Sequence, residues 1–245
     1  MIYICIPARD EEKTLGPLLW RIRSVFTDPE FQRDFRILVA DDGSSDRTPQ
    51  VLERYKTAVP LEVFNWPQRR GYAATLEGLL REAVDRSRYP KRDLVVTLQA
   101  DLTEHPDHLV PLVKAAEGGA DLVGCAMDGG LDALPSQVRW GRRLAPHLAR
   151  RIFKGAPITD PVRSLRAYRV VVLRKAFREA GDGPMLREDG WAANVELLKA
   201  VTPHARRVAE VPVPMRYDLL HRESRFRVGP ALKGLFRVRR GIAWS

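Results

Sequence analysis

The chain has 245 residues, of which 44% are apolar and 29% are charged, a composition typical of a soluble globular protein. No apolar run approaches the roughly 20 residues that cross a bilayer, so the sequence predicts no membrane-spanning helix. Lysine and arginine outnumber aspartate and glutamate by 41 to 31, and this net charge of +10 favours anionic partners.

Short β-branched runs alternate with amphipathic stretches through the first half of the chain. Strands are expected at 2–7, 35–40, 61–65, 93–101 and 120–126, and helices at 11–26, 45–56, 71–87 and 106–119. The first run lacks a basic head and is interpreted as a strand, not as a signal peptide. Alternation at this spacing predicts a Rossmann-like α/β fold, with a mostly parallel sheet flanked by helices. Cys5 and Cys125 fall in apolar strands, so we expect buried, reduced thiols.

The second half has a less regular pattern. Strands are expected at 165–169 and 207–218, the latter at a sheet edge because it contains prolines, with a helix at 191–201 between them. A loop at 127–136, a basic amphipathic helix at 137–153 and a terminal amphipathic helix at 228–244 complete the pattern. We expect one domain over 1–245, with a nucleotide-binding half at 1–125 and a smaller acceptor half at 126–245.

Acidic residues follow three of the expected parallel strands. Glu11 comes after the first strand, Asp41 and Asp42 after the second, and Asp101 after the fourth. Ligands of open parallel sheets bind beyond the carboxyl ends of the strands, so we expect these acids to converge. The glycine-rich loops of dinucleotide-binding and P-loop proteins are absent. Acidic side chains beside a nucleotide diphosphate require a divalent cation between the carboxylates and the phosphates. An alternative is that Asp-Asp-Gly-Ser simply forms a turn.

Six motifs, in order, are similar to those of family 2 glycosyltransferases. IPARDEEKTLGPLL resembles an opening P-x-x-N-E-E, VADDGSSDRT resembles D-D-G-S-x-D-x-T, RRGYAATLEGL resembles N-x-G-x-x-x-A-x-x-x-G, and LQADLTEHPDHL resembles D-A-D-x-x-x-x-P. ITDPVRSLRAYR and EDGWAANVELLKA resemble D-P-x-S-G-F-R-A-Y-R and G-[FW]-x-x-x-x-E-L-L of the polyprenyl-phosphate (dolichol-phosphate) mannosyltransferase subgroup. The resemblance covers roughly residues 2–225 and implies the GT-A fold and a nucleotide-sugar donor.

The same resemblance implies site residues by position. Those expected to contact the nucleotide sugar are Pro7, Ala8, Arg9, Glu11, Asp41, Asp42, Gln99, Ala100, Asp101, Ser224 and Arg225. Asp101 is the implied ligand of a divalent cation, Mg²⁺ or Mn²⁺. Arg166 is placed near the donor phosphates or an acceptor phosphate, and Ser224 and Arg225 are placed in a segment that closes over the site.

Departures from the family motifs concern the metal and the acceptor. Gln99 replaces the first acid of D-x-D, and an amide carries no charge. Metal affinity should therefore fall, unless another acid such as Glu104 assists. Arg9 replaces the usual asparagine, and Val-Arg-Ser-Leu-Arg at 162–166 replaces T-S-G-F-R, so the acceptor loop is expected to differ.

The resemblance implies an inverting, metal-assisted glycosyltransferase that acts on a lipid phosphate or a hydroxyl. A hydroxyl acceptor needs a general base, and Glu188 or Asp189 is the best candidate. A phosphate needs none, because its second pKa is about 6. Both acids precede the helix at 191–201, so an open alternative is that they only stabilise its N-terminus. Glu196 is interpreted as a structural hydrogen-bond partner.

The C-terminal segment, from His204 to Ser245, has ten lysines and arginines against three acidic residues. Its basic and apolar mixture favours peripheral docking of a cytoplasmic enzyme on the inner face of an anionic membrane, near a polyprenyl-phosphate or glycolipid acceptor. A helix packed on the domain with its arginines in water is the alternative.

Two rival functions remain open. A catalytically silent nucleotide-sugar-binding protein is suggested by Gln99, and a module that binds nucleic acid or anionic surfaces is suggested by the charge. The second rival does not explain acids at the carboxyl edge of the sheet, so we expect no nucleic-acid partner.

Overall fold

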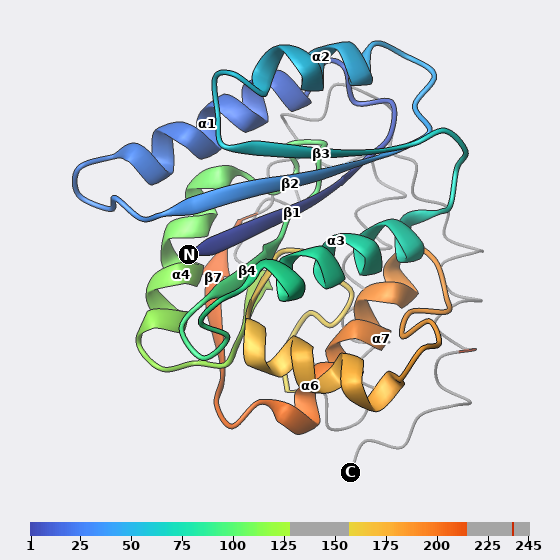
Figure 1. The fold of residues 1–245 in the computed structure, drawn as a ribbon. Coiled ribbons are helices and arrows are strands. Elements are labelled where there is room, and N and C mark those ends of the chain that lie inside the picture. Colours follow the sequence, from blue (N-terminus) through green and yellow to red (C-terminus); the bar gives the residue numbers. More distant parts are fainter. Residues whose placement is uncertain (128–156, 215–236, 238–245) are drawn as a thin grey trace.

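The computed structural model describes residues 1–127, 157–214 and 237, and a seven-stranded sheet runs through these residues (Figure 1). The strands are β1 (Ile2–Ala8), β2 (Phe35–Asp42), β3 (Leu61–Trp66), β4 (Leu94–Thr97), β5 (Leu122–Met127), β6 (Arg166–Arg169) and β7 (Val208–Val213). The helices are α1 (Leu15–Thr27), α2 (Thr48–Tyr55), α3 (Tyr72–Arg86), α4 (Leu109–Glu117), α6 (Val170–Ala180) and α7 (Trp191–Val201). Short 3₁₀ turns occupy Pro106–His108 and Thr202–His204.

The strand order is β3-β2-β1-β4-β6-β5-β7. β1 pairs in parallel with β2 and β4, β2 pairs in parallel with β3, and β5 pairs in parallel with β7. β6 is antiparallel to both of its neighbours, β4 and β5. The predicted mostly parallel sheet is therefore confirmed, and so is the edge position of the proline-containing strand β7.

Helices cover both faces of the sheet, as the continuous apolar strands predicted. Along β1, Ile2, Ile4 and Ile6 pack in one core with α1, α2 and α4, whereas Tyr3 and Cys5 pack in a second core with α3, α6 and α7. This alternation follows from the two-residue period of a strand. Figure 1 shows α1 and α2 on one side of β1 and β2, with α3, α6 and α7 on the other. Both cysteines are buried and free, as expected.

The main differences from the sequence-based expectations concern α1, β4 and α6. α1 begins at Leu15, four residues after the predicted start at residue 11. β4 ends at Thr97, four residues before the predicted end, because the chain turns there into the loop that carries Asp101. α6 was not predicted at all. It follows β6 without a turn and opens with Val170, Val171 and Val172, whose β-branched side chains favour a strand.

Several expectations fall on residues outside the described ranges. They are the loop after residue 127, the helices at 137–153 and 228–244, and the end of the strand at 207–218. The division into a donor half and an acceptor half stays a prediction. Within the described residues, no helix has both the length and the apolar character needed to cross a membrane.

Candidate active site

The second strand ends in two buried aspartates, Asp41 and Asp42. Asp41 Oδ1 accepts a hydrogen bond from the Ser44 amide at 3.1 Å and another from the Ser44 hydroxyl. Gly43 has φ +66°, and a Cβ atom there would lie 3.0 Å from the Arg69 amide nitrogen, so a larger residue would be strained in this turn. The Asp-Asp-Gly-Ser stretch therefore does form a turn, and this turn brings both carboxylates to the sheet edge.

Asp42 and Asp189 meet around Gly71, in the loop that enters α3. Asp42 accepts hydrogen bonds from the amides of Arg70 at 2.5 Å and Gly71 at 3.1 Å. Asp189 Oδ1 accepts from the Ala73 amide at 2.9 Å, which places its carboxylate at the positive end of the α3 dipole. Gly71 has φ +93°, and a Cβ atom there would lie 3.2 Å from Asp189 Oδ2. Two acids that lie 147 positions apart in the sequence, Asp42 and Asp189, thus bind one short stretch of backbone.

The loop after β1 is fastened to the turn after β2. The Asp10 amide donates to the Ser44 hydroxyl at 2.8 Å, and the Ser45 amide donates to Asp10 Oδ1 at 2.7 Å. The Glu11 amide donates to Thr48 Oγ1 at 2.8 Å. These bonds hold the two loops together at the carboxyl edge of the sheet, where the sequence predicted a ligand site.

The other residues expected on the nucleoside side lie at the same edge. The parallel register places Ala8 beside Asp41, with Pro7 half-buried one residue earlier. The half-buried Arg9 has its Nε atom 3.6 Å from Asp10 Oδ2. The structure brings these residues together, and their contact with a nucleoside stays a prediction.

The loop after β4 holds Asp101 in a strained turn. Asp101 is buried, and its Oδ1 accepts hydrogen bonds from the Thr103 amide at 3.1 Å and the Thr103 hydroxyl at 2.6 Å. Leu102 has φ +63°, a left-handed conformation that is uncommon for a bulky residue. Gln99 is half-buried and Ala100 is buried. The expected donor-side triplet therefore lies where β4 reaches the carboxyl edge.

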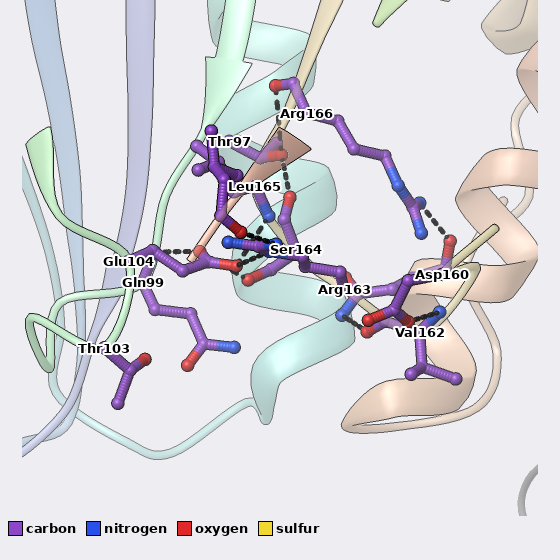
Figure 2. A network of polar contacts seen from close by, with 12 residues as sticks. Thr97, Gln99, Thr103, Glu104, Asp160, Val162, Arg163, Ser164, Leu165 and Arg166 are labelled. Atoms are coloured by element: carbon purple, nitrogen blue, oxygen red, sulfur yellow. Dashed lines mark hydrogen bonds and ion pairs between the residues drawn. The ribbon is translucent and has the colours of Figure 1, made fainter. Parts of the chain in front are cut away.

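A buried polar network centred on Glu104 lies beside this loop (Figure 2). Glu104 Oε1 accepts from the Leu165 amide at 3.0 Å, Oε2 accepts from the Ser164 hydroxyl at 2.8 Å, and Arg163 Nε lies 3.6 Å from Oε1. Burial raises the pKa of the Glu104 carboxyl, and the nearby Arg163 guanidinium opposes the rise. Glu104 would have to leave these partners to replace the acid that is missing at Gln99.

Arg166 is buried in the described structure, and its guanidinium joins two segments of the chain. Its Nη1 donates to the Asn194 carbonyl at 2.6 Å and its Nη2 donates to the Pro161 carbonyl at 2.5 Å. These bonds brace the segment before β6 against α7. The Nε atom is also buried, so the predicted contact with a phosphate would require a rearrangement. That contact stays a prediction.

Glu188, which precedes α7, and Glu196, which lies within it, have different contacts. Glu196 Oε2 accepts hydrogen bonds from the amides of Arg187 at 2.8 Å and Glu188 at 2.9 Å, as expected for a structural partner. The Glu188 carboxylate lies 3.5 Å from Arg237 Nη1. A catalytic role for Glu188 stays a prediction.

Replacing Glu196 with glutamine should stabilise the protein slightly at neutral pH, by less than about 1 kcal/mol, because solvent screens the half-buried carboxylate. One oxygen accepts both amide bonds, so a glutamine carbonyl can keep them. Burial raises the pKa of the Glu196 carboxyl above its ordinary value of 4.5. The stability from such a group is complete below its unfolded-state pKa and is lost as the pH rises through its folded-state pKa. Urea unfolding of both proteins at pH 4 and pH 7 measures the difference in their free energies of unfolding. The prediction is contradicted if the wild type becomes more stable relative to E196Q as the pH rises.

A comparison with family models places the chain. The model described as glycosyl transferase family 2 matches residues 3–177, well over half of the sequence. The chain belongs to glycosyl transferase family 2. The resemblance read from the six motifs is thereby confirmed at the level of the family.

Curated relatives of this family 2 chain include transferases named for undecaprenyl phosphate. The undecaprenyl-phosphate 4-deoxy-4-formamido-L-arabinose transferase of Pseudomonas paraeruginosa is 33% identical over 216 residues, which cover 84% of this chain and 58% of the relative. The enzyme of the same name from Edwardsiella ictaluri is 28% identical over 231 residues, which cover 92% of this chain and 62% of the relative. The chain thus spans about three fifths of the length of these relatives.

Solved structures similar to the family 2 chain share its fold. Glucosyl-3-phosphoglycerate synthase from Mycobacterium tuberculosis, in complex with Mn²⁺, UDP and phosphoglyceric acid, has a TM-score of 0.65 at 20% identity, covering 100% of this chain and 80% of that one. S. aureus TarS 1–349 with UDP has a TM-score of 0.56 at 17% identity, covering 86% and 60%. At these identities the likeness concerns the fold alone, and it confirms the predicted GT-A architecture.

The family 2 chain has a donor set that suits a cation held mainly by a nucleotide. Proteins usually bind Mg²⁺ through one or two carboxylates together with phosphate oxygens of the substrate and several water molecules. Asp101 would supply one carboxylate at the carboxyl edge, and Gln99 would supply an uncharged oxygen two residues earlier. The described residues contain no group of three or more His, Cys, Asp or Glu side chains suited to a metal. The residues present therefore fit a cation that is bound mainly by the nucleotide. Ser224 and Arg225, which were also expected at the donor site, lie outside the described ranges.

Two features of the site were not predicted from the sequence. One is the meeting of Asp42 and Asp189 at Gly71. The other is the buried pair of Glu104 and Arg163. The second had a readable signal, since Arg163 places a cation where the family motif has serine. A buried cation requires a buried acid nearby.

Proposed function

We propose that this chain is an inverting, nucleotide-sugar-dependent glycosyltransferase that moves a sugar to a polyprenyl phosphate. The observation that carries the proposal is the convergence of the loops after β1, β2 and β4, which bring Asp41, Asp42 and Asp101 to one sheet edge. Parallel sheets bind their ligands at this edge. Membership of family 2 agrees with a nucleotide-sugar donor.

The donor is held by two groups of residues in this proposal. Pro7, Ala8, Arg9 and Glu11 contact the nucleoside together with Asp41 and Asp42. Asp101 and Gln99 face the diphosphate, where Asp101 holds Mg²⁺ or Mn²⁺. When bound, the cation neutralises the charge that develops on the departing nucleotide diphosphate.

The acceptor is a lipid phosphate in this proposal. The relatives are named as undecaprenyl-phosphate transferases, and the +10 net charge favours an anionic acceptor and an anionic membrane surface. A phosphate attacks without a general base at neutral pH. Asp189 then acts through its hydrogen bond to the Ala73 amide, as a cap for α3.

The test is sugar transfer by the purified chain with Mn²⁺ or Mg²⁺. The donor is first chosen by a thermal-shift screen of nucleoside diphosphates, since a ligand at about 100 times its dissociation constant adds about 2.7 kcal/mol of stability. Labelled nucleotide sugars are then offered with polyprenyl phosphate in anionic liposomes. Labelled lipid is the expected product. Nucleotide-sugar binding without any product would instead support a catalytically silent binder.

A hydroxyl acceptor is the second candidate. It is favoured by the position of Asp189, a candidate general base, next to Gly71, whose amide donates to Asp42. Asp189→Asn separates the two, because the asparagine oxygen can still accept from Ala73 but cannot act as a base. With a phosphate acceptor, transfer by D189N should stay within about threefold of wild type. With a hydroxyl acceptor it should fall about 10²-fold or more, the usual share of a general base.

The substitution Gln99→Asp should strengthen cation binding, because it adds a charged oxygen two residues before Asp101. We expect the Mn²⁺ affinity measured with nucleoside diphosphate present to rise about tenfold, the effect of roughly 1.4 kcal/mol. Titration calorimetry of both proteins gives the two affinities. Equal values would exclude Gln99 from the surroundings of the cation.

A further inference from the structure

We infer that Glu104 is a positioning residue, which fixes the loop of Asp101 against the acceptor-side segment 160–166 and so sets where a cation–nucleotide complex is held. The inference rests on the proposed function, because it gives Asp101 the role described there. Glu104 itself touches neither substrate nor cation. It acts through the loop that it closes (Figure 2).

The loop between Gln99 and Glu104 cannot hold its shape by local preference alone. Leu102 lies in the left-handed region at φ +63° and is buried, a conformation that costs about 1–3 kcal/mol and persists only when surrounding contacts impose it. Glu104 Oε2 accepts the Gln99 amide at 3.4 Å, which closes the loop on itself around Asp101. The other hydrogen bonds of the Glu104 carboxylate come from residues outside this loop.

Those outer ties reach a segment sixty residues away. The Ser164 hydroxyl and the Leu165 amide donate to the two Glu104 oxygens, and the Thr97 hydroxyl donates to the Ser164 carbonyl. Ser164 is therefore held from both β4 and the loop that follows it. Because Thr97 also pairs with Arg166 across the β4–β6 ladder, the loop and the segment leave the same place in the sheet.

The charge of the network is matched within the described residues. Arg163 and Glu104 have side chains that are each 1% exposed, with Nε 3.6 Å from Oε1, and Arg163 Nη1 donates to the Val213 carbonyl at 3.1 Å. Arg163 stands where the family motif has serine, whereas Glu104 occupies a position that the motif leaves open. A buried pair of this kind contributes a fixed arrangement more than net stability.

Displacement of Asp101 is the expected result of weakening this network. A misplacement of about 1 Å can lower a catalysed rate about 10²-fold, and a cation bound by one carboxylate is sensitive to the same shift. The nucleoside side of the site is held by hydrogen bonds between the loops after β1 and β2 and between Asp42 and the Arg70 amide, and Glu104 takes part in none of these bonds. Nucleotide binding without a cation should therefore be untouched.

The experiment compares nucleotide affinity with and without Mn²⁺, by calorimetry on the full chain. The probe is the nucleoside diphosphate that binds the wild type most tightly in the presence of Mn²⁺. In Glu104→Gln the Mn²⁺-dependent gain in affinity should fall about tenfold, while the affinity without Mn²⁺ stays within about twofold. Ser164→Ala removes only one hydroxyl from the network, and its gain should fall about threefold by the same reasoning.

Asp93 offers a matched control at the opposite end of β4. Its buried carboxylate accepts from the Ser87 hydroxyl at 2.7 Å and the Tyr89 amide at 3.3 Å, and it faces the N-terminal ammonium at 3.2 Å. Asp93→Asn should destabilise the protein without changing the Mn²⁺-dependent gain in nucleotide affinity. An equal loss of the Mn²⁺-dependent gain in D93N would mean that general destabilisation causes the effect, and it would overturn the inference.

Each other outcome also decides. An undiminished gain in E104Q overturns the inference, and so does a wild type whose nucleotide affinity does not depend on Mn²⁺. If E104Q does not fold, S164A decides alone, and an unchanged gain in S164A counts against the inference. Sugar transfer is not measured, so a chain that binds but never transfers would refute the proposed function and leave this result standing.

Discussion

Replacing Asp101 with asparagine should lower sugar transfer at least about a hundredfold, the usual effect of removing one group that stabilises transition-state charge. Asparagine has nearly the shape of aspartate, and its oxygen can still accept the Thr103 amide and hydroxyl bonds. The turn should therefore survive, and the loss should come from the missing negative charge beside the cation. Initial rates at saturating donor, together with melting temperatures, separate chemistry from folding.

Asp28 provides the control for this prediction. Its Oδ1 accepts the Glu30 amide at 2.8 Å, the same two-residue turn that Asp101 makes, but it follows α1 at the amino-terminal side of β2. Asp28→Asn should leave the transfer rate within about twofold of wild type, as expected for a surface change. A D101N protein that keeps more than about a tenth of wild-type transfer would remove Asp101 from the reaction, given the size expected of such a group.

Local patterns in the sequence predicted most of the elements in the first half of the fold. The strands from β1 to β5 are apolar runs between helical stretches, and the alternation of Ile2, Tyr3 and Ile4 between two cores is a local property of a strand. The antiparallel insertion of β6 between β4 and β5 is not local. It depends on pairs such as Val96 with Ala167, which only the folded chain brings together.

The candidate site divides in the same way. The carboxyl-edge rule predicted that Asp41, Asp42 and Asp101 lie at one edge, because it needs only the order of strands along the chain. The partner of Asp189 is the Ala73 amide, 116 positions away, and no periodicity in the sequence encodes that contact. Arg166 shows the limit of position-based inference, because the motif gives the residue but not the carbonyls that occupy its guanidinium.

Neutralising Glu104 should lower the free energy of unfolding by about 3 kcal/mol, because it leaves the Arg163 guanidinium buried without a counter-charge. In Glu104→Gln the side-chain carbonyl can still accept the Leu165 amide, but the amide nitrogen in the place of Oε2 cannot accept from the Gln99 amide, so the variant loses the charge and this loop bond. Arg163→Met should be milder, since burial already raises the pKa of the Glu104 carboxyl and favours its neutral form once the cation is gone. Urea unfolding of both single variants at pH 7 gives the two values.

The double variant E104Q/R163M decides whether the two charges act as a pair. It should be more stable than E104Q alone, with a coupling of about 2 kcal/mol, because no buried charge is left without its partner. The exposed pair of Arg21 and Asp107 is the matched control, since its Nε–Oδ1 distance is 2.7 Å but both side chains are about half exposed. Asp107→Asn should lower stability by less than about 1 kcal/mol. Additive losses in the buried cycle would mean that Glu104 and Arg163 stabilise the fold separately, and Arg163 would then need another source of compensation in the interior.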